Sequence, residues 1–274
     1  MILLLQLLVT LALSVLYAIN INFNFALIEI FRVVLAFLVL NLAAVIVVLI
    51  TFVLLIYISE KFPKNSLWKH KSMHYFNKYI FNFLYRVKPI IIGKENLPKD
   101  NNFVVYSNHI EYTDPLYIKQ AFKDYPLAYV SKEELFKIPV MKNILRGTGC
   151  IPLSRKAGDR QALQAILEAI KAIKSGQPFG IFPEGTRSHS NSVAEFKSGS
   201  FKLAQKAGAD IVPVVLYNMH KTVDFIKFIR ARVYVKILPV IKYKDYKDME
   251  TNDLSLKVHQ LIADELERFK SRSF

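Results

Sequence analysis

Two long apolar runs open the chain. Residues 1–18 carry no charge, and residues 33–59 run for 27 positions without one. About 20 apolar residues suffice to cross the hydrocarbon core of a bilayer, so the second run can span it with some tilt. The first run lacks the basic flank and small-residue cleavage site of a secretory signal. We therefore expect a retained, membrane-embedded pair of hydrophobic helices over residues 1–60, with the turn at the asparagines of residues 20–24.

Positive charge and aromatic side chains follow this head. Residues 61–88 contain seven Lys and Arg, interleaved with Trp, Tyr and Phe. A basic flank places this side of the membrane in the cytoplasm by the positive-inside rule. A basic, aromatic-rich stretch also suits the lipid headgroup region, so residues 61–88 are interpreted as an interfacial, linking helix. The alternative is that residues 72–87 are simply the first helix of the following domain.

Beyond residue 88, strand patterns alternate with helical ones. Short runs rich in Val, Ile and Phe predict strands at 89–92, 103–107, 127–130, 150–153, 179–182, 211–217 and 232–238. Helical spacing predicts helices at 115–123, 133–146, 159–174, 198–207 and 254–270. Several strand runs are continuously apolar, as strands buried on both faces are. The alternation predicts an α/β domain over residues 89–274, with a three-layer mixed sheet flanked by helices.

Charge separates the two parts of the chain. Residues 1–60 have a net charge of −1, whereas residues 61–274 carry 36 Lys and Arg against 20 Asp and Glu, a net charge of +16. An apolar head on a basic body favours an anionic membrane surface or an anionic substrate, with nucleic acid as the competing interpretation of charge alone. The single cysteine, Cys150, excludes an internal disulfide and a multi-cysteine zinc site.

A histidine and an aspartate follow the predicted strand 103–107. His109 would emerge at the carboxyl end of that strand, where open α/β sheets bind ligands. Asp114-Pro115 is typical of a helix start, with Asp114 at the cap. A tight loop would let the Asp114 carboxylate bind one ring nitrogen of His109 and leave the other to take a proton from an alcohol. The alternative is a helix cap beside an ordinary surface histidine.

A second polar block, Phe182–Ser188, follows the predicted strand at 179–182. Gly185 permits a backbone conformation that a side chain would block, and a free N–H there could face the oxyanion of a tetrahedral intermediate. Arg187 offers a planar fork suited to phosphate oxygens. Arg155 follows another short strand, and a second arginine at the same edge would complete a pocket for a phosphomonoester. Plain surface turns and solvated arginines are the alternatives.

These blocks carry a resemblance to a known family. Asn108-His109-x4-Asp114, Gly149-x-Ile151-x3-Arg155, Phe182–Ser188 and Ile211–Val214 are similar, in order and spacing, to four blocks of the glycerolipid acyltransferases. The Phe-Pro-Glu-Gly-Thr-Arg form of the third block favours the 1-acylglycerol-3-phosphate (lysophosphatidate) acyltransferases over the glycerol-3-phosphate enzymes. The resemblance also implies a glycerol-3-phosphate acyltransferase-like fold.

The resemblance implies an enzyme of phospholipid biosynthesis at the cell membrane, and the basic flank predicts that its catalytic domain lies on the cytoplasmic face. It would transfer an acyl group from a thioester of acyl carrier protein or coenzyme A to the sn-2 hydroxyl of lysophosphatidate, giving phosphatidate. His109 would be the general base and Asp114 its orienting partner. Acceptor and phosphate binding are assigned to Arg155, Glu184, Gly185, Thr186 and Arg187. Ile211–Val214 would form an apolar substrate wall or, alternatively, a core strand.

Other classes of function have less support. The Gly-x-Ser-x-Gly elbow of a serine hydrolase and the phosphate loop of nucleotide enzymes do not occur. A metal site through His189, His220 and Glu184 lacks the local two-ligand spacing of a zinc helix, so we expect no metal, no bound cofactor and no nucleic-acid partner. Two alternatives stay open: an acyltransferase for glycerol 3-phosphate or another lysophospholipid, and a membrane-anchored module that binds anionic lipid without catalysis.

Overall fold

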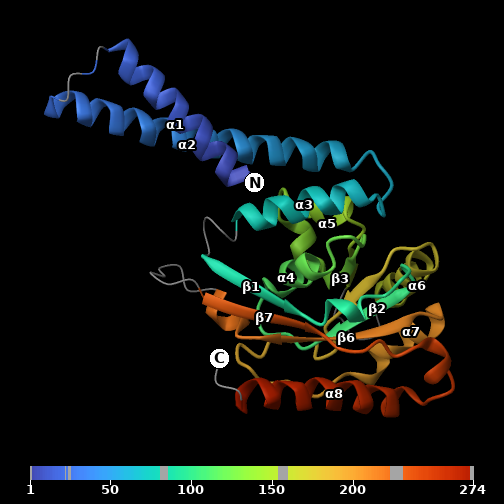
Figure 1. Ribbon diagram of the computed structural model, residues 1–274. Coiled ribbons are helices and arrows are strands. Elements are labelled where there is room, and N and C mark those ends of the chain that lie inside the picture. The colour runs from blue at the N-terminus through green and yellow to red at the C-terminus, as the bar shows by residue number, and fades with distance from the viewer. Residues whose placement is uncertain are drawn as a thin grey trace. The chain divides into compact units, whose positions relative to one another are not determined.

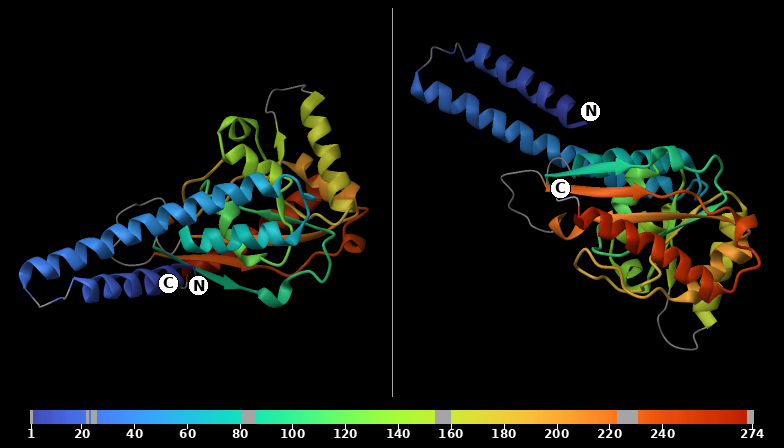
Figure 2. Two further views of the ribbon diagram at one scale, coloured as in Figure 1. Left: turned by 90° about the horizontal axis from the view of Figure 1, so that it is seen from above. Right: turned by 60° about the horizontal axis from the view of Figure 1, so that its bottom comes forward.

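The structure is a computed structural model of the chain. It describes residues 2–21, 23, 26–80, 86–153, 160–222 and 231–271, without the side chains of residues 160–162. The chain divides into two compact units, Met1–Ser59 and Glu60–Phe274. Figures 1 and 2 show the secondary structure of each unit.

The first unit is a pair of packed helices, α1 (Ile2–Asn20) and α2 (Leu27–Ser59). Both are long and apolar enough to cross a membrane, which confirms the predicted pair of hydrophobic helices. α1 ends at the expected turn, while Asn22 and Asn24 lie outside the described residues.

Burial in this unit is inverted relative to a water-soluble helix pair. The buried residues of α1 are polar and spaced four apart, Gln6, Thr10 and Ser14, whereas its leucines are largely exposed. Gln6 and Thr10 hydrogen-bond Asn41 of α2 at 3.5 and 3.2 Å. A polar seam inside an apolar surface suits hydrocarbon surroundings, where polar side chains join helices and lipid covers the rest.

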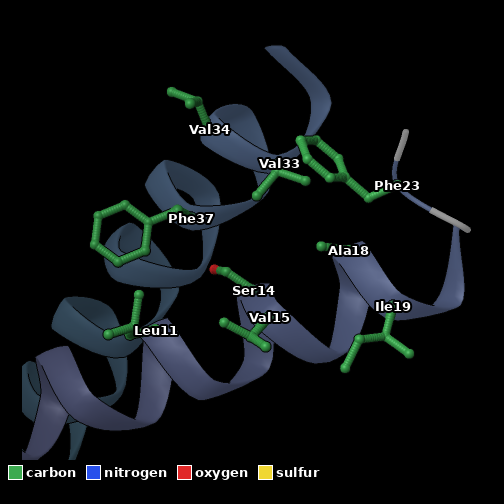
Figure 3. Close-up of a pocket in the computed structure, with 9 residues that line it drawn as sticks. All are labelled: Leu11, Ser14, Val15, Ala18, Ile19, Phe23, Val33, Val34 and Phe37. Carbon is green, nitrogen blue, oxygen red and sulfur yellow. The ribbon is translucent and has the colours of Figure 1, made fainter. Parts of the chain in front are cut away.

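An apolar gap of about 750 Å³ lies beside this seam. Figure 3 shows it between α1 and the first turns of α2, with Leu11, Val15 and Phe37 among its lining side chains. Among the described residues of the lining, Ser14 alone is polar. Such a lining suits lipid acyl chains rather than a polar ligand.

The second unit is built on a mixed seven-stranded sheet. Its strands are β1 (Val87–Ile92), β2 (Phe103–Ser107), β3 (Ala128–Lys132), β4 (Ile151–Leu153), β5 (Phe179–Ile181), β6 (Asp210–Tyr217) and β7 (Ala231–Ile237). They lie in the order β1-β7-β6-β2-β5-β3-β4. Every neighbouring pair is parallel except β6–β7. All seven predicted strands are present. They could be predicted because strands that are buried on both faces have continuous apolar sequences.

Helices cover both faces of this sheet, so the predicted three-layer architecture is confirmed. They are α3 (Leu67–Ile80), α4 (Asp114–Ala121), α5 (Met141–Gly147), α6 (Arg160–Lys174), α7 (Lys202–Ala207) and α8 (Thr251–Ser271). Figure 1 shows α8 along one face and α3 and α4 on the other. The right-hand view of Figure 2 shows α8 passing over the strands, and α8 packs on β6.

Two predicted helices differ in the structure. The helix expected over 133–146 is a 3-10 turn, Glu133–Lys137, followed by α5. Pro139 separates the two, because a proline disfavours helical geometry at the residue before it, and Ile138 is extended. The 198–207 segment likewise begins as a 3-10 turn, Ser198–Phe201, before α7.

The segment after the head is helical. Helix α3 spans Leu67–Ile80, within the predicted linking segment 61–88, and begins before the alternative range of 72–87; residues 81–85 lie outside the described part of the chain. A location of residues 61–88 in the lipid headgroup region stays a prediction.

The centre of the sheet holds the core of the second unit. All five residues of β2 are buried, and Ile211, Val212 and Val214 of β6 are fully buried beside them. Residues 211–214 therefore form a core strand, the alternative that the sequence left open. The aligned carboxyl ends of β2 and β5 leave this core at one edge of the sheet.

Candidate active site

Two loops meet where β2 and β5 end. Tyr106 pairs with Ile181 in parallel register, so residues 108–113 and 182–188 leave the sheet side by side. Two backbone hydrogen bonds then join the loops, from Ser188 N–H to the His109 carbonyl (2.9 Å) and from His189 N–H to the Ile110 carbonyl (3.2 Å). The two polar blocks of the sequence thus form one site.

His109 and Asp114 form the predicted pair. His109 Nδ1 lies 2.9 Å from Asp114 Oδ2, and the same oxygen accepts the backbone N–H groups of Ile110 (2.6 Å) and Glu111 (2.9 Å). The imidazole stacks on the Phe182 ring with centroids 4.1 Å apart. Within the described residues, Nε2 has no hydrogen-bond partner, and the His109 side chain keeps 18% of its surface exposed. One nitrogen is held and the other faces outward.

The expected role of Asp114 as a helix cap is wrong. Thr113 is the N-cap residue, and Asp114 is the first residue of α4. Its carboxylate turns back toward the loop instead, where three N–H donors share Oδ2. A fully buried carboxylate is costly to desolvate, and burial accordingly raises the pKa of Asp114 although these hydrogen bonds lower it. An imidazolium formed at His109 would compensate that buried charge.

Glu184 supports His109 through the backbone. Its Oε1 accepts the His109 N–H at 2.7 Å, and its Oε2 accepts the Ala194 N–H at 3.0 Å. Glu184 is only 4% exposed, and burial raises the pKa of its carboxyl against these hydrogen bonds. Both oxygens are already occupied, and a carboxylate repels phosphate. The geometry therefore supports a positioning role rather than the acceptor binding implied by the resemblance.

Arg187 extends from the second loop over the first. Its Nη1 lies 4.0 Å from Glu111 Oε2, and its guanidinium sits 5.6 Å from the centre of the Tyr112 ring. The Arg187 side chain is 40% exposed, so it is oriented but open to a ligand. Glu111 is buried and also binds His189 Nδ1 at 2.9 Å. Glu111 was missed from the sequence, because a lone glutamate between His109 and Asp114 does not reveal which loop it faces.

Gly185 adopts a left-handed conformation with φ of 71°, which agrees with the expectation that a side chain would be unfavourable here. The expectation that its N–H is free is wrong, because this group donates to the Phe182 carbonyl at 3.1 Å and closes the turn. A Cβ at this position would lie 2.8 Å from the Nζ of Lys197. Glycine thus makes room for a further cation over the turn, beside the exposed Thr186. Lys197 was not predicted from the sequence, because only the folded turn places it beside Gly185.

Two other residues complete the account of the predicted site. Arg155 lies outside the described residues; the strand before it, β4, runs parallel to β3 and ends at the same edge as β5, with β3 between them. Asn108 is buried and holds the first loop against β6, donating to the Leu216 carbonyl (3.0 Å) and accepting the Leu216 N–H (2.8 Å).

Over the described part of the chain, no three His, Cys, Asp or Glu residues lie close enough together to hold a metal ion.

Comparisons with known proteins show which proteins the chain is similar to. A family model described as Acyltransferase matches residues 88–217. The 1-acyl-sn-glycerol-3-phosphate acyltransferase of Borreliella burgdorferi is 36% identical over 188 residues, which cover 67% of this chain and 74% of that protein. The enzyme of that name from Bacillus subtilis is 31% identical over 123 residues, covering 45% of this chain and 59% of its own.

A solved structure is also similar. The 1-acyl-sn-glycerophosphate (LPA) acyltransferase PlsC from Thermotoga maritima matches with a TM-score of 0.64 and 30% identity. The match covers 75% of this chain and 81% of that one.

Proposed function

The chain belongs to the acyltransferase family that includes the 1-acyl-sn-glycerol-3-phosphate acyltransferases, and we propose that it acylates the sn-2 hydroxyl of lysophosphatidate to give phosphatidate. The observation that carries the proposal is the pairing of His109 with buried Asp114, beside Arg187 on the adjoining loop. This arrangement places a base that can deprotonate the acceptor hydroxyl beside a cation that can bind the acceptor phosphate.

The base acts through the outward nitrogen of His109. Nε2 takes the proton of the acceptor hydroxyl as its oxygen attacks the thioester carbonyl carbon, and a tetrahedral intermediate forms. The carbon–sulfur bond then breaks, and the imidazolium returns the proton to the departing thiolate. Asp114 holds Nδ1 and stabilises the imidazolium between these steps. Transfer is direct, without an acyl-enzyme.

The phosphate of the acceptor is bound at the rim of the same loops. Arg187 offers a bidentate fork, and its contacts to Glu111 and Tyr112 limit the freedom it would lose on binding. Lys197 lies over the Gly185 turn, so it supplies a second positive charge beside the second loop. Arg155, following β4 along the same sheet edge, is proposed as a third cation for this group.

The membrane supplies the acceptor and takes the product, because both are lipids. The apolar surface of the first unit fits that setting. We further propose that the second unit lies on the cytoplasmic face, on account of the basic residues 61–88. The acyl donor is an acyl thioester of acyl carrier protein or of coenzyme A, used as a co-substrate with no bound cofactor.

An acceptor panel tests this function. The purified full chain, in neutral detergent, would be given an acyl thioester and either lysophosphatidate, lysophosphatidylcholine or glycerol 3-phosphate. Phosphatidate formed from lysophosphatidate, with much slower acylation of the other two acceptors, is the expected result. Running each acceptor with both thioesters identifies the donor. Equal use of lysophosphatidylcholine would contradict phosphate recognition, and glycerol 3-phosphate as the best acceptor would favour the alternative enzyme.

A further inference from the structure

A cavity with several polar lining residues lies in the second unit, away from the two loops of the candidate active site. It has a volume of about 370 Å³ and is formed by α3, by β1 with the turn after it, and by the end of α4. β1 runs parallel to β7, which is antiparallel to β6, so β1 ends at the sheet edge opposite to the candidate active site. Along α4, Gln120 lies six residues from Asp114, about 9 Å at 1.5 Å per residue.

Two buried nitrogen atoms at this cavity have no hydrogen-bond partner among the residues that the structure describes. Gln120 is 7% exposed, and its Nε2 finds no acceptor within the described residues. The Nδ1 of His74 is likewise buried without a hydrogen bond. Unsatisfied buried polar groups are rare in folded proteins, so a pair lining one cavity points to a missing ligand.

Three of the four charged residues that line the cavity are lysines. Lys78 and Lys94 line it, and neither forms an ion pair with any acidic side chain that the structure describes. The one lining carboxylate, Asp124, is already flanked by Lys71 at 3.4 Å and Lys123 at 3.3 Å. Burial, helped by the charges of Lys78 and Lys123, lowers the pKa of His74, so its ring is neutral near pH 7.

We propose that this cavity is a second anion site, which binds a phosphate group through Gln120, Lys78 and Lys94. The Gln120 amide N–H and the two lysine ammonium groups are hydrogen-bond donors, and phosphate oxygens are acceptors suited to all three. His74 offers a further N–H in the tautomer that carries its proton on Nδ1.

The size of the cavity fits a small phosphate ester. Its volume lies in the lower part of the range for small-molecule sites, above what a few waters need. Ile91, Leu97 and Ala121 add apolar lining, which suits the carbon skeleton of an ester rather than a bare ion alone. The same group occurs free in solution or as a lipid headgroup, so the test includes both sources.

The test is calorimetric titration of the full chain with inorganic phosphate. The protein carries Arg187→Ala, which weakens the proposed acceptor site and leaves this cavity untouched. We expect saturable binding whose affinity falls at least about tenfold when Lys78 and Lys94 are both replaced by alanine. The charge-matched control replaces Lys244 and Lys257, exposed lysines outside the cavity, and should keep the affinity.

A second variant distinguishes a loss of phosphate binding from a loss of the folded structure. Gln120→Leu keeps much of the side-chain volume but removes the buried donor, so phosphate affinity should fall while thermal unfolding stays near that of the parent protein. Undetectable binding to the parent, or equal affinities for the Lys78/Lys94 and Lys244/Lys257 double variants, would overturn the proposal.

Nanodiscs separate the two sources of phosphate. If the lipid headgroup is the occupant, discs that contain phosphatidylglycerol should weaken the titration by inorganic phosphate relative to phosphatidylcholine discs, and Gln120→Leu should abolish that difference. If the occupant is soluble, both discs should give the same affinity. Because the readout is binding away from His109, it is independent of whether the chain acylates lysophosphatidate.

Discussion

The carboxylate of Glu184 accepts the backbone N–H of His109 at 2.7 Å, across 75 residues of sequence. This bond, with the second one from Ala194, holds the base-bearing loop against the glycine turn. The residue that the family resemblance would assign to substrate thus acts on the backbone of the base.

Glu184→Gln separates these two roles. The amide has one acceptor oxygen where the carboxylate has two, so one of the two backbone N–H groups loses its partner, at a cost of about 1–3 kcal/mol in stability. We expect kcat to fall while the KM for lysophosphatidate stays nearly constant, because the change displaces His109 and not the acceptor. Steady-state kinetics and thermal unfolding measure both effects, with exposed Glu195→Gln as the control. A raised acceptor KM at normal kcat would instead indicate direct contact with substrate.

Arg187→Lys tests phosphate recognition. The substitution keeps the charge but loses the planar fork and its stacking over Tyr112. The KM for lysophosphatidate should rise about tenfold, whereas the KM for the thioester should change little. Arg146→Lys, at an exposed arginine of α5, should alter neither constant. An effect on the thioester KM alone would assign Arg187 to the donor.

The lowered pKa of His70 predicts how the stability of the folded chain depends on pH. Burial and the nearby Lys119 lower the pKa of this α3 histidine from 6.5 to about 3. Between these values the unfolded chain binds a proton that the folded chain does not, so stability falls as pH drops from 6.5 toward 3. The full effect is at most about 5 kcal/mol.

His70→Gln should make that acid loss shallower. Thermal unfolding from pH 7 to pH 4 measures it, with His259→Gln on α8 as a matched control. Parallel curves for the parent protein and the His70 variant would show that another group controls acid sensitivity.

The inverted burial of the first unit predicts firm membrane attachment. Apolar side chains cover the outside of this helix pair, and the Thr10–Asn41 contact lies inside it. The full chain should therefore remain in the membrane fraction in high salt and be released from it by detergent. A chain without residues 1–60 should bind anionic vesicles weakly and come off as salt screens its charge. Release of the intact chain by salt alone would rule out an embedded first unit.

Much of the fold was predictable from the sequence, for a physical reason. Parallel strands buried on both faces, such as β2, need unbroken apolar runs, and membrane helices need long ones. The prediction of a single helix over 133–146 was wrong because the apolar spacing continues across Pro139, whereas the helical backbone is interrupted there.

The site was predictable in its residues but less so in its contacts. His109 and Asp114 are close in sequence, so a loop pairing them was foreseeable. The hydrogen bonds of Glu184 and Glu111 and the position of Lys197 depend on how two distant loops pack, which no local pattern encodes. Arg155 stays a prediction, since it lies outside the described residues.

The central claim is that His109 is the base for acylation of lysophosphatidate. Its most direct test is single-turnover formation of phosphatidate by the full chain and by His109→Ala, each shown to unfold at a similar temperature. Loss of a positioned general base should slow turnover at least about 10²-fold, without a comparable loss of lysophosphatidate binding. Phosphatidate formation at a near-normal rate in the folded variant would contradict the account.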